Sequence, residues 1–437
     1  MKMKKGLFAI LAFVNLCFSI NAQVRFHSLQ DVLDFAGTHA IGIQNSEKQE
    51  ELLALKTKES KTNLLPTISA NIAYNDNITL QPVLIPEDVF NPSAPDGSFR
   101  EITFGTKYNY YIGGRAQWEV LNFQKLFALK TAEADWQKGK VSTSINKMNT
   151  YNTLANTYYS ILLTQEAIRI YKENISATQT IYTSAQNKYQ KGIISEADLN
   201  MAEIRKIKAE SSLHNAANNL NQLFAQLQSQ LNITDFIQID DNLSTFLVDE
   251  KIIASTHPEV LLKEAEIQKQ ENIIKQAKAL RYPVFSLSYQ NSITWAGQQF
   301  FNFSNVNELP NQIFGANLSI PIGNFPTKQK IKESKLELEM KQSDLENTKL
   351  VKDKEDELLK LRLDQANEQF NLNKKILHLQ STNDKHSENK YQKEVIGLDE
   401  RLNQYEDLLT VQDAYLQSLG ALTIAKYQLY IRKLNYN

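Results

Sequence analysis

The stretch Asn187–Leu199 reads Asn-Lys-Tyr-Gln-Lys-Gly-Ile-Ile-Ser-Glu-Ala-Asp-Leu and separates two long segments of helical pattern. Residues 122–191 before the turn contain no Pro and a single Gly, and their apolar residues recur at spacings of three and four. That is about 70 residues, or roughly 105 Å as one helix. Gly192 supplies the backbone freedom that ends a helix, and Ser195 with Asp198 three residues later has the pattern of an N-cap. The stretch therefore predicts a turn between two helices.

A near copy of this stretch lies at Asn389–Leu402, which reads Asn-Lys-Tyr-Gln-Lys-Glu-Val-Ile-Gly-Leu-Asp-Glu-Arg-Leu. Glu394 stands where the first copy has glycine, so we expect Gly397 to supply the turn instead. The copies predict a twofold internal repeat, in which each half has a helix, a strand pair and a long helical hairpin. The predicted boundaries are a first repeat at 23–231, a connector at 232–256 and a second repeat at 257–437, with strand pairs at about 66–118 and 283–322.

The first 22 residues have the pattern of a secretory signal peptide. Lysines at positions 2, 4 and 5 precede the apolar run Leu7–Ile20, which is too short to span a bilayer, and Ala22 offers a small residue for cleavage. A signal anchor is the alternative. Cys17 is the only cysteine, and it lacks the small preceding residue that bacterial lipid attachment needs. We therefore predict an exported protein without a thiol, a disulfide or a lipid anchor.

The composition and the motif content give no indication of an enzyme. The net charge of −1 gives no reason to expect a nucleic-acid partner. The sequence has no nucleophile elbow, no phosphate-binding glycine loop and no metalloprotease helix, and its six histidines lack the spacing of metal ligands. We interpret His39 and His257 as residues at helix starts. The sequence therefore predicts no catalysis, no cofactor and no metal.

Four segments change from helical periodicity to alternating apolar and polar residues, which predicts strands with one face of each kind. They lie at about 67–75, 102–120, 285–295 and 314–322, with a Pro-rich loop at 81–98. Tyr and Trp on the apolar faces are typical of a membrane interface, and the polar faces suit a water-filled lumen. Four strands cannot close a membrane barrel, but three copies of the chain would supply twelve and leave no edge. The alternative is a small sandwich in a soluble protein.

The ordered set of these features resembles the TolC-like outer-membrane efflux protein family over the whole chain after the leader. The features are the leader, the repeat, the strand pair ending in Ile320-Pro321-Ile322-Gly323, and the motif Tyr189-x-x-Gly192-x-x-Ser195-x-x-Asp198-Leu199. The resemblance implies a mainly α-helical fold with a small β part. Long coiled-coil hairpins would form a tunnel, and four strands per chain would contribute to a trimeric, twelve-stranded outer-membrane β-barrel.

For function, the resemblance implies a homotrimeric channel-tunnel in the outer membrane that extends into the periplasm. It would be the passive exit duct of a tripartite efflux or type I secretion system. Its partners would be a periplasmic membrane-fusion adaptor, an inner-membrane transporter of the RND, ABC or MFS type, and outer-membrane lipid. A periplasmic coiled-coil scaffold or adaptor without a pore is the alternative function.

The resemblance also implies roles for individual residues. The helix turns would form the periplasmic tip where the adaptor docks, and the matching residues are Tyr189, Gly192, Ser195, Tyr391 and Gly397. Asp198 and Glu400 match acidic residues that ring the pore entrance, with helix capping as the alternative for both. Five aromatic residues of the alternating segments are candidate membrane-interface anchors, with ordinary burial as the alternative: Tyr108, Tyr110, Trp118, Tyr289 and Trp295.

Overall fold

A computed structural model describes residues 24–243, 256–322, 325–434 and 436. The predicted leader at 1–22, with Cys17, and part of the predicted connector lie outside these residues. The chain divides into two compact units. The helical unit comprises Met1–Glu50, Gly139–Lys263 and Leu345–Asn437, and the sheet unit comprises Glu51–Lys138 and Glu264–Asp344.

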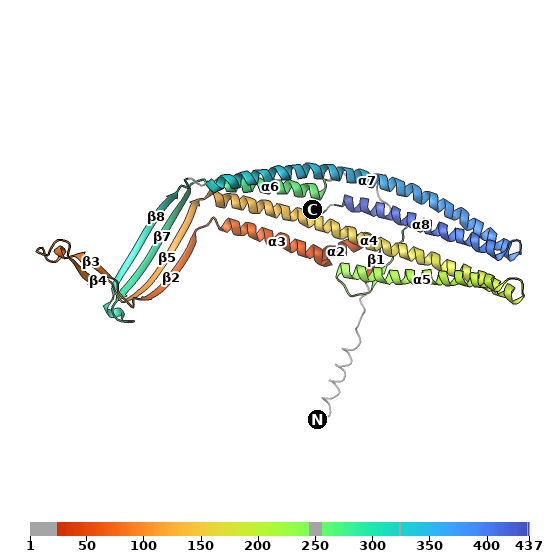
Figure 1. Cartoon of the computed structure of the whole chain (residues 1–437), viewed down its shortest axis with the longest axis horizontal. Helices are drawn as coiled ribbons and strands as arrows, with labels where there is room; N and C mark the ends of the chain where they lie inside the picture. Colours follow the sequence, from red (N-terminus) through yellow and green to blue (C-terminus); the bar gives the residue numbers. More distant parts are fainter. Residues whose placement is uncertain (1–23, 244–255, 323–324, 435, 437) are drawn as a thin grey trace, which may run out of the picture. The chain divides into compact units, whose positions relative to one another are not determined.

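Four long helices form two hairpins (Figure 1). α4 (Phe123–Gln190) and α7 (Phe325–Gln392) have 68 residues each, which is about 100 Å at the usual rise of 1.5 Å per residue. α5 (Glu196–Leu231) and α8 (Leu398–Lys433) follow them and have 36 residues each. Over the described part of the chain, none of the helices combines the length and the hydrophobicity needed to cross a bilayer.

The first described residues pack into the core of the helical unit. β1 (Val24–Phe26) pairs in parallel with β6 (Ile237–Ile239). α2 (Leu29–His39) follows, and its apolar stripe is fully buried in one cluster with side chains of α4, α5 and α8. Burial of each such aliphatic side chain contributes roughly 1.5–3 kcal/mol. The apolar stripe therefore fixes α2 against the long helices.

The two histidines have different positions. α2 ends at His39, because the next residue, Ala40, has extended backbone angles (φ −67°, ψ 118°). α3 (Ile41–Thr62) begins directly after Ala40. The expectation that His39 begins a helix is therefore wrong. His257 directly precedes α6 (Pro258–Ala279), so the expectation for His257 is confirmed.

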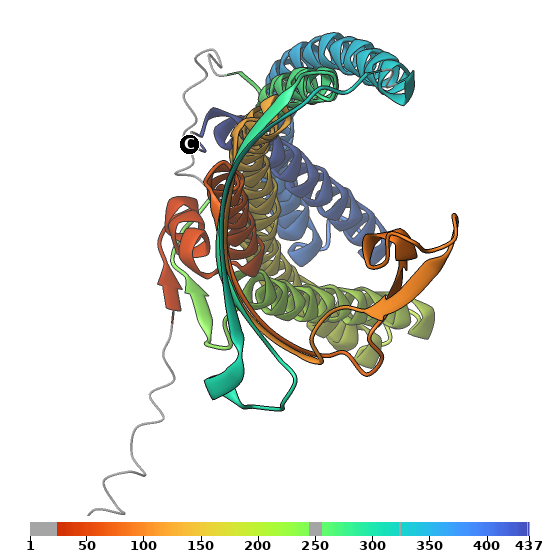
Figure 2. The same cartoon turned by 90° about the vertical axis from the view of Figure 1, so that its left-hand side faces the viewer.

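The sheet unit contains a four-stranded antiparallel sheet in the order β2-β5-β7-β8 (Figure 1). The strands are β2 (Thr67–Asp76), β5 (Tyr108–Leu121), β7 (Val284–Gly297) and β8 (Asn307–Ser319). β2 and β8 are the edge strands, and no described strand pairs with their outer sides. The sheet is curved, as Figure 2 shows.

The register confirms that this sheet has two chemically different faces, because residues opposite one another in the ladder project to the same side. Ile72, Ile112 and Ile293 lie opposite one another near the middle of one side, which we call the apolar face. Aromatic residues lie on this face toward both ends of the strands: Tyr74, Tyr110 and Trp295 at one, and Trp118, Tyr289 and Phe314 at the other. The opposite side, the polar face, includes Ser69, Asn71, Arg115, Ser288, Gln290 and Asn317, with exceptions such as Ala73, Tyr111, Leu309 and Ile313.

The segment between β2 and β5 differs from the sequence prediction. A loop was expected at 81–98 and a long strand at 102–120, but β3 (Pro82–Pro86) and β4 (Phe99–Thr103) form a separate hairpin, joined through the short 3-10 helix η1 (Glu87–Val89). The two prolines stand at the ends of β3, on a strand with only one neighbour, where a missing N–H is tolerated. Gly105, at φ 116°, separates β4 from β5.

Candidate functional sites at the helix turns and on the sheet

The first interhelical turn is closed by backbone hydrogen bonds that need a left-handed residue. The N–H of Ile193 donates to the Lys188 carbonyl at 2.9 Å, and the N–H of Gly192 donates to the Tyr189 carbonyl at 2.8 Å. Gly192 has φ 70°, which a residue without a Cβ adopts at little cost. This is the Schellman arrangement that ends many helices, so the predicted role of Gly192 in the turn is structurally explained.

The second turn repeats this geometry with a different residue. The N–H of Val395 donates to the Lys390 carbonyl at 2.9 Å, and the N–H of Glu394 donates to the Tyr391 carbonyl at 3.2 Å. Glu394 itself has φ 58°. Gly397 is instead the N-cap of α8, with extended backbone angles (φ −77°, ψ 171°). The expectation that Gly397 supplies the turn is therefore wrong, because the glutamate adopts the left-handed conformation.

Asp198 and Glu400 occupy matching helix positions, but their partners differ. Asp198 accepts the backbone N–H of Ser195 at 2.9 Å and its hydroxyl at 2.8 Å, and the Ser195 oxygen accepts the N–H of Asp198 at 3.2 Å. The Ser195 hydroxyl and N–H hold the Asp198 pKa below its ordinary value. Gly397 offers no side chain for such a capping box, and among the described residues Glu400 accepts a single hydrogen bond, of 3.2 Å, from Gln404 on its own helix. Capping thus accounts for Asp198 but not for Glu400.

The two turn tyrosines also differ. Tyr189 is 40% exposed, whereas Tyr391 is 3% exposed and packs in an apolar cluster with Ile181, Leu398 and Tyr405. The ammonium of Lys188, on the first hairpin, lies 4.3 Å from the centre of the Tyr391 ring. Within the chain, the Tyr391 side chain therefore packs between the two hairpins and offers little surface to a partner. Sequence reasoning overlooked Ile193 and Val395, which are exposed at matching positions of the turns.

A buried ion pair that the sequence analysis missed lies within the second hairpin. Arg401 of α8 is 2% exposed, and its Nη1 lies 2.5 Å from Oδ1 of Asp384 on α7. The guanidinium also lies over the Tyr405 ring, 5.4 Å from its centre. Burial raises the pKa of the Tyr405 phenol, so this hydroxyl stays neutral. The pair fixes the register of α8 against α7 just beyond the turn.

The predicted interface aromatics all lie on the apolar face, but they are not equally accessible. Trp118 and Tyr289 are exposed, and the Trp118 indole N–H donates to the Leu64 carbonyl at 2.9 Å. Tyr108 and Trp295 are half-buried. Tyr110 is buried under Phe301 and Phe303 of the β7–β8 loop, with ring centres 5.4 and 5.1 Å away.

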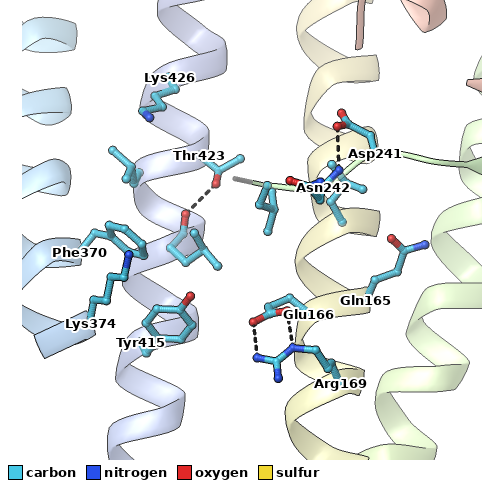
Figure 3. A pocket seen from close by; sticks show the side chains of 14 residues that line it. Gln165, Glu166, Arg169, Asp241, Asn242, Phe370, Lys374, Tyr415, Thr423 and Lys426 are labelled. Carbon is cyan, nitrogen blue, oxygen red and sulfur yellow. Dashed lines mark hydrogen bonds and ion pairs between the residues drawn. The ribbon is translucent and has the colours of Figure 1, made fainter. Parts of the chain in front are cut away.

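A pocket of about 560 Å³ lies between α4, α7 and α8 in the helical unit (Figure 3). Glu166 binds Arg169 through two hydrogen bonds of 2.8 and 2.9 Å, and Glu173 binds the same guanidinium at 2.7 Å. Asp241 accepts the Tyr158 hydroxyl at 2.6 Å. These lining charges are satisfied within the protein, so we assign no ligand to the pocket.

Together, the two-faced sheet and the long hairpins define the fold class of outer-membrane channels. The fold is similar to that of the MtrE outer membrane channel of Neisseria gonorrhoeae in its open state, with 16% identity, a TM-score of 0.75, and coverage of 93% of this chain and 88% of that one. It is also similar to the CusC channel, with 14% identity, a TM-score of 0.76 and coverage of 93% and 91%. A membrane protein from Pseudomonas aeruginosa gives 12% identity, a TM-score of 0.77 and coverage of 94% and 91%.

The sequence supports the same class. Residues 58–232 match the sequence model of the family described as outer membrane efflux protein. No curated protein matches the sequence significantly. Residues 58–232 thus resemble outer-membrane efflux proteins in sequence, and the chain resembles outer-membrane channels in fold.

Proposed function

We propose that three copies of the chain assemble into an outer-membrane channel-tunnel that is the passive exit duct of a tripartite efflux or secretion system. The observation that carries this proposal is the sheet, which exposes an apolar face, has a polar face behind it and leaves both edge strands open. Exposure of apolar side chains such as Ile72 (78%) is unfavourable in water and favourable in lipid. Pairing β8 of one copy with β2 of the next would close a twelve-stranded barrel, with the polar face toward the lumen.

The hairpins would form the wall of the tunnel. At about 100 Å, α4 and α7 are more than three times as long as the ~30 Å hydrocarbon core of a bilayer. Their turns would then form a periplasmic tip far from the outer membrane. Ten further residues would lengthen a helix by only about 15 Å. The large number of residues in α4 and α7 is therefore what would let them extend from the membrane to a distant tip.

The exposed surface of the tip is the proposed docking site for a periplasmic membrane-fusion adaptor. Tyr189, Ile193 and Val395 supply apolar contact area, while Gly192, Ser195 and Gly397 shape the turns. A photoreactive residue at position 193 should capture the adaptor in cells, whereas one at Leu372, exposed on α7, should not. Equal capture at both positions would exclude this docking site. An inner-membrane transporter would supply the energy through the adaptor.

The duct and the scaffold alternative predict different behaviour of the purified protein. The duct should fractionate with the outer membrane, require detergent for extraction and give stepwise conductance in a planar lipid bilayer. A periplasmic scaffold or adaptor without a pore should be released by osmotic shock without detergent and give no conductance steps. Release of the protein in plain buffer would reject the duct.

A further inference from the structure

The loop between β7 and β8 packs aromatic rings against tyrosines of the apolar face of the sheet. The ring of Phe300 lies 5.8 Å from Tyr74 and 5.6 Å from Tyr108, centre to centre. The Phe301 and Phe303 rings lie 5.4 and 5.1 Å from Tyr110, and the Phe301 N–H donates to the Tyr110 hydroxyl at 2.9 Å. The loop therefore adds three aromatic rings to one end of the apolar face, which we call the phenylalanine cluster (Phe300, Phe301 and Phe303).

The phenylalanine cluster is held in place at a conformational cost and yet remains exposed. Phe301 has φ 53°, a left-handed conformation that is rare for a bulky residue. Although they pack on the tyrosines, the three phenylalanines stay 51–64% exposed. An exposed apolar patch of this kind marks a surface that binds protein, ligand or membrane.

The surroundings of the patch favour lipid as its occupant. The tyrosines beneath the cluster lie on the same side of the sheet as Ile72, so the patch is continuous with the exposed apolar face. The Lys107 ammonium lies 5.1 Å from the centre of the Tyr108 ring and places a cation beside the patch. Aromatic rings next to a cation suit the boundary between acyl chains and anionic headgroups.

We propose that the phenylalanine cluster inserts into the outer leaflet of the membrane, at the boundary between acyl chains and headgroups. This inference rests on the proposed function, because it requires the apolar face to contact lipid. The β7–β8 loop lies at the end of the sheet away from α4 and α6, which is the external end of the proposed barrel. Instead of extending into water, the loop would anchor the outer rim of the barrel in the membrane.

Site-directed spin labelling of the full-length protein in liposomes tests this proposal, since the chain has no cysteine after the predicted leader. Nitroxides at Phe300→Cys and Phe303→Cys are compared with Ile72→Cys on the apolar face and Asn71→Cys on the polar face. The proposal predicts greater accessibility to oxygen than to a water-soluble nickel chelate at 300, 303 and 72, and the reverse at 71. The proposal is overturned if the nitroxides at 300 and 303 are accessible to the nickel chelate, or if neither reagent reaches them because another protein surface covers them. In either case, a nitroxide at position 72 that oxygen reaches from the lipid would leave the proposed duct intact. Nickel access at Ile72 overturns the duct as well.

The variant Tyr110→Phe, made together with the labelled Phe303→Cys, provides a second readout. It keeps the ring but deletes the hydroxyl that accepts the Phe301 N–H. We expect the nitroxide at 303 to become more mobile and more accessible to the nickel chelate, while the label at Ile72 is unchanged. An unchanged signal at 303 would show that the Tyr110 hydroxyl does not position the phenylalanine cluster.

Discussion

Glu394 occupies, after the second long helix, the left-handed backbone position that Gly192 occupies after the first, with φ angles of 58° and 70°. The two turns make the same pair of backbone hydrogen bonds, so the geometry is shared although the residue is not. A side chain in this conformation costs about 1–2 kcal/mol because its Cβ approaches the following carbonyl oxygen. The second turn is therefore strained at a point where the first is not.

The first prediction concerns this strain. Glu394→Gly should raise the stability of the protein by about 1 kcal/mol, and Gly192→Ala should lower it by a similar amount. Thermal unfolding of the detergent-solubilised protein, followed by circular dichroism, measures both. Glu368→Gly, exposed in the interior of α7, is the control and should be destabilising by about 1 kcal/mol. If Glu394→Gly behaved like this control, the left-handed residue would not be a source of strain.

The second prediction concerns pH and the capping box of α5. The folded protein holds the Asp198 pKa below the ordinary value of 3.8, so the box stabilises the fold above that pH and loses its effect as the pH falls below it. Asp198→Asn should therefore lower the unfolding midpoint at pH 7, and the difference from the wild type should shrink near pH 3. Glu203→Gln, exposed on the same helix, is the control. A difference that stayed constant with pH would rule out the carboxylate as its origin.

The third prediction concerns the buried pair of Arg401 and Asp384. Asp384→Leu leaves the guanidinium buried without its partner, which typically costs 3–5 kcal/mol, so the unfolding midpoint should fall clearly. The double variant Arg401→Met/Asp384→Leu removes both charges and should recover most of the loss. A double-mutant cycle on denaturant unfolding measures the coupling. Additive losses in the double variant would argue against a direct interaction.

The fourth prediction concerns ion selectivity. If both carboxylates ring the entrance of the proposed pore, their replacement should weaken cation preference. Because Asp198 is engaged in its capping box and Glu400 is not, Glu400→Gln should reduce the preference more than Asp198→Asn. The reversal potential across a planar bilayer in a salt gradient measures this. Unchanged ion selectivity in the double variant Asp198→Asn/Glu400→Gln would exclude a ring of these carboxylates at the pore entrance.

The sequence predicted the features that depend on local periodicity. The uninterrupted helical pattern anticipated α4, and the alternation of apolar and polar residues anticipated which sides of β2 and β7 are apolar. The Ser195–Asp198 spacing anticipated a cap. Each of these signals comes from residues close together in the chain, where side-chain position follows directly from helix or strand geometry.

The features that sequence missed depend on conformation or on distant contacts. A glycine near a turn is an attractive choice for the left-handed position, and nothing local showed that Glu394 would adopt it while Gly397 became the N-cap. Phe301 contacts Tyr110 across 191 residues, so no periodic pattern connects them. Tyr391 carries the same local motif as Tyr189, and only the packing of the second hairpin against the first reveals that it is buried.

The central claim is that separate copies of the chain complete one another's sheet within a membrane. Native mass spectrometry of the protein, extracted from the outer-membrane fraction in detergent, tests this claim most directly. The account predicts a complex of three chains, which supplies twelve strands from three four-stranded sheets. A monomer that stays dissolved after the detergent is removed would contradict it.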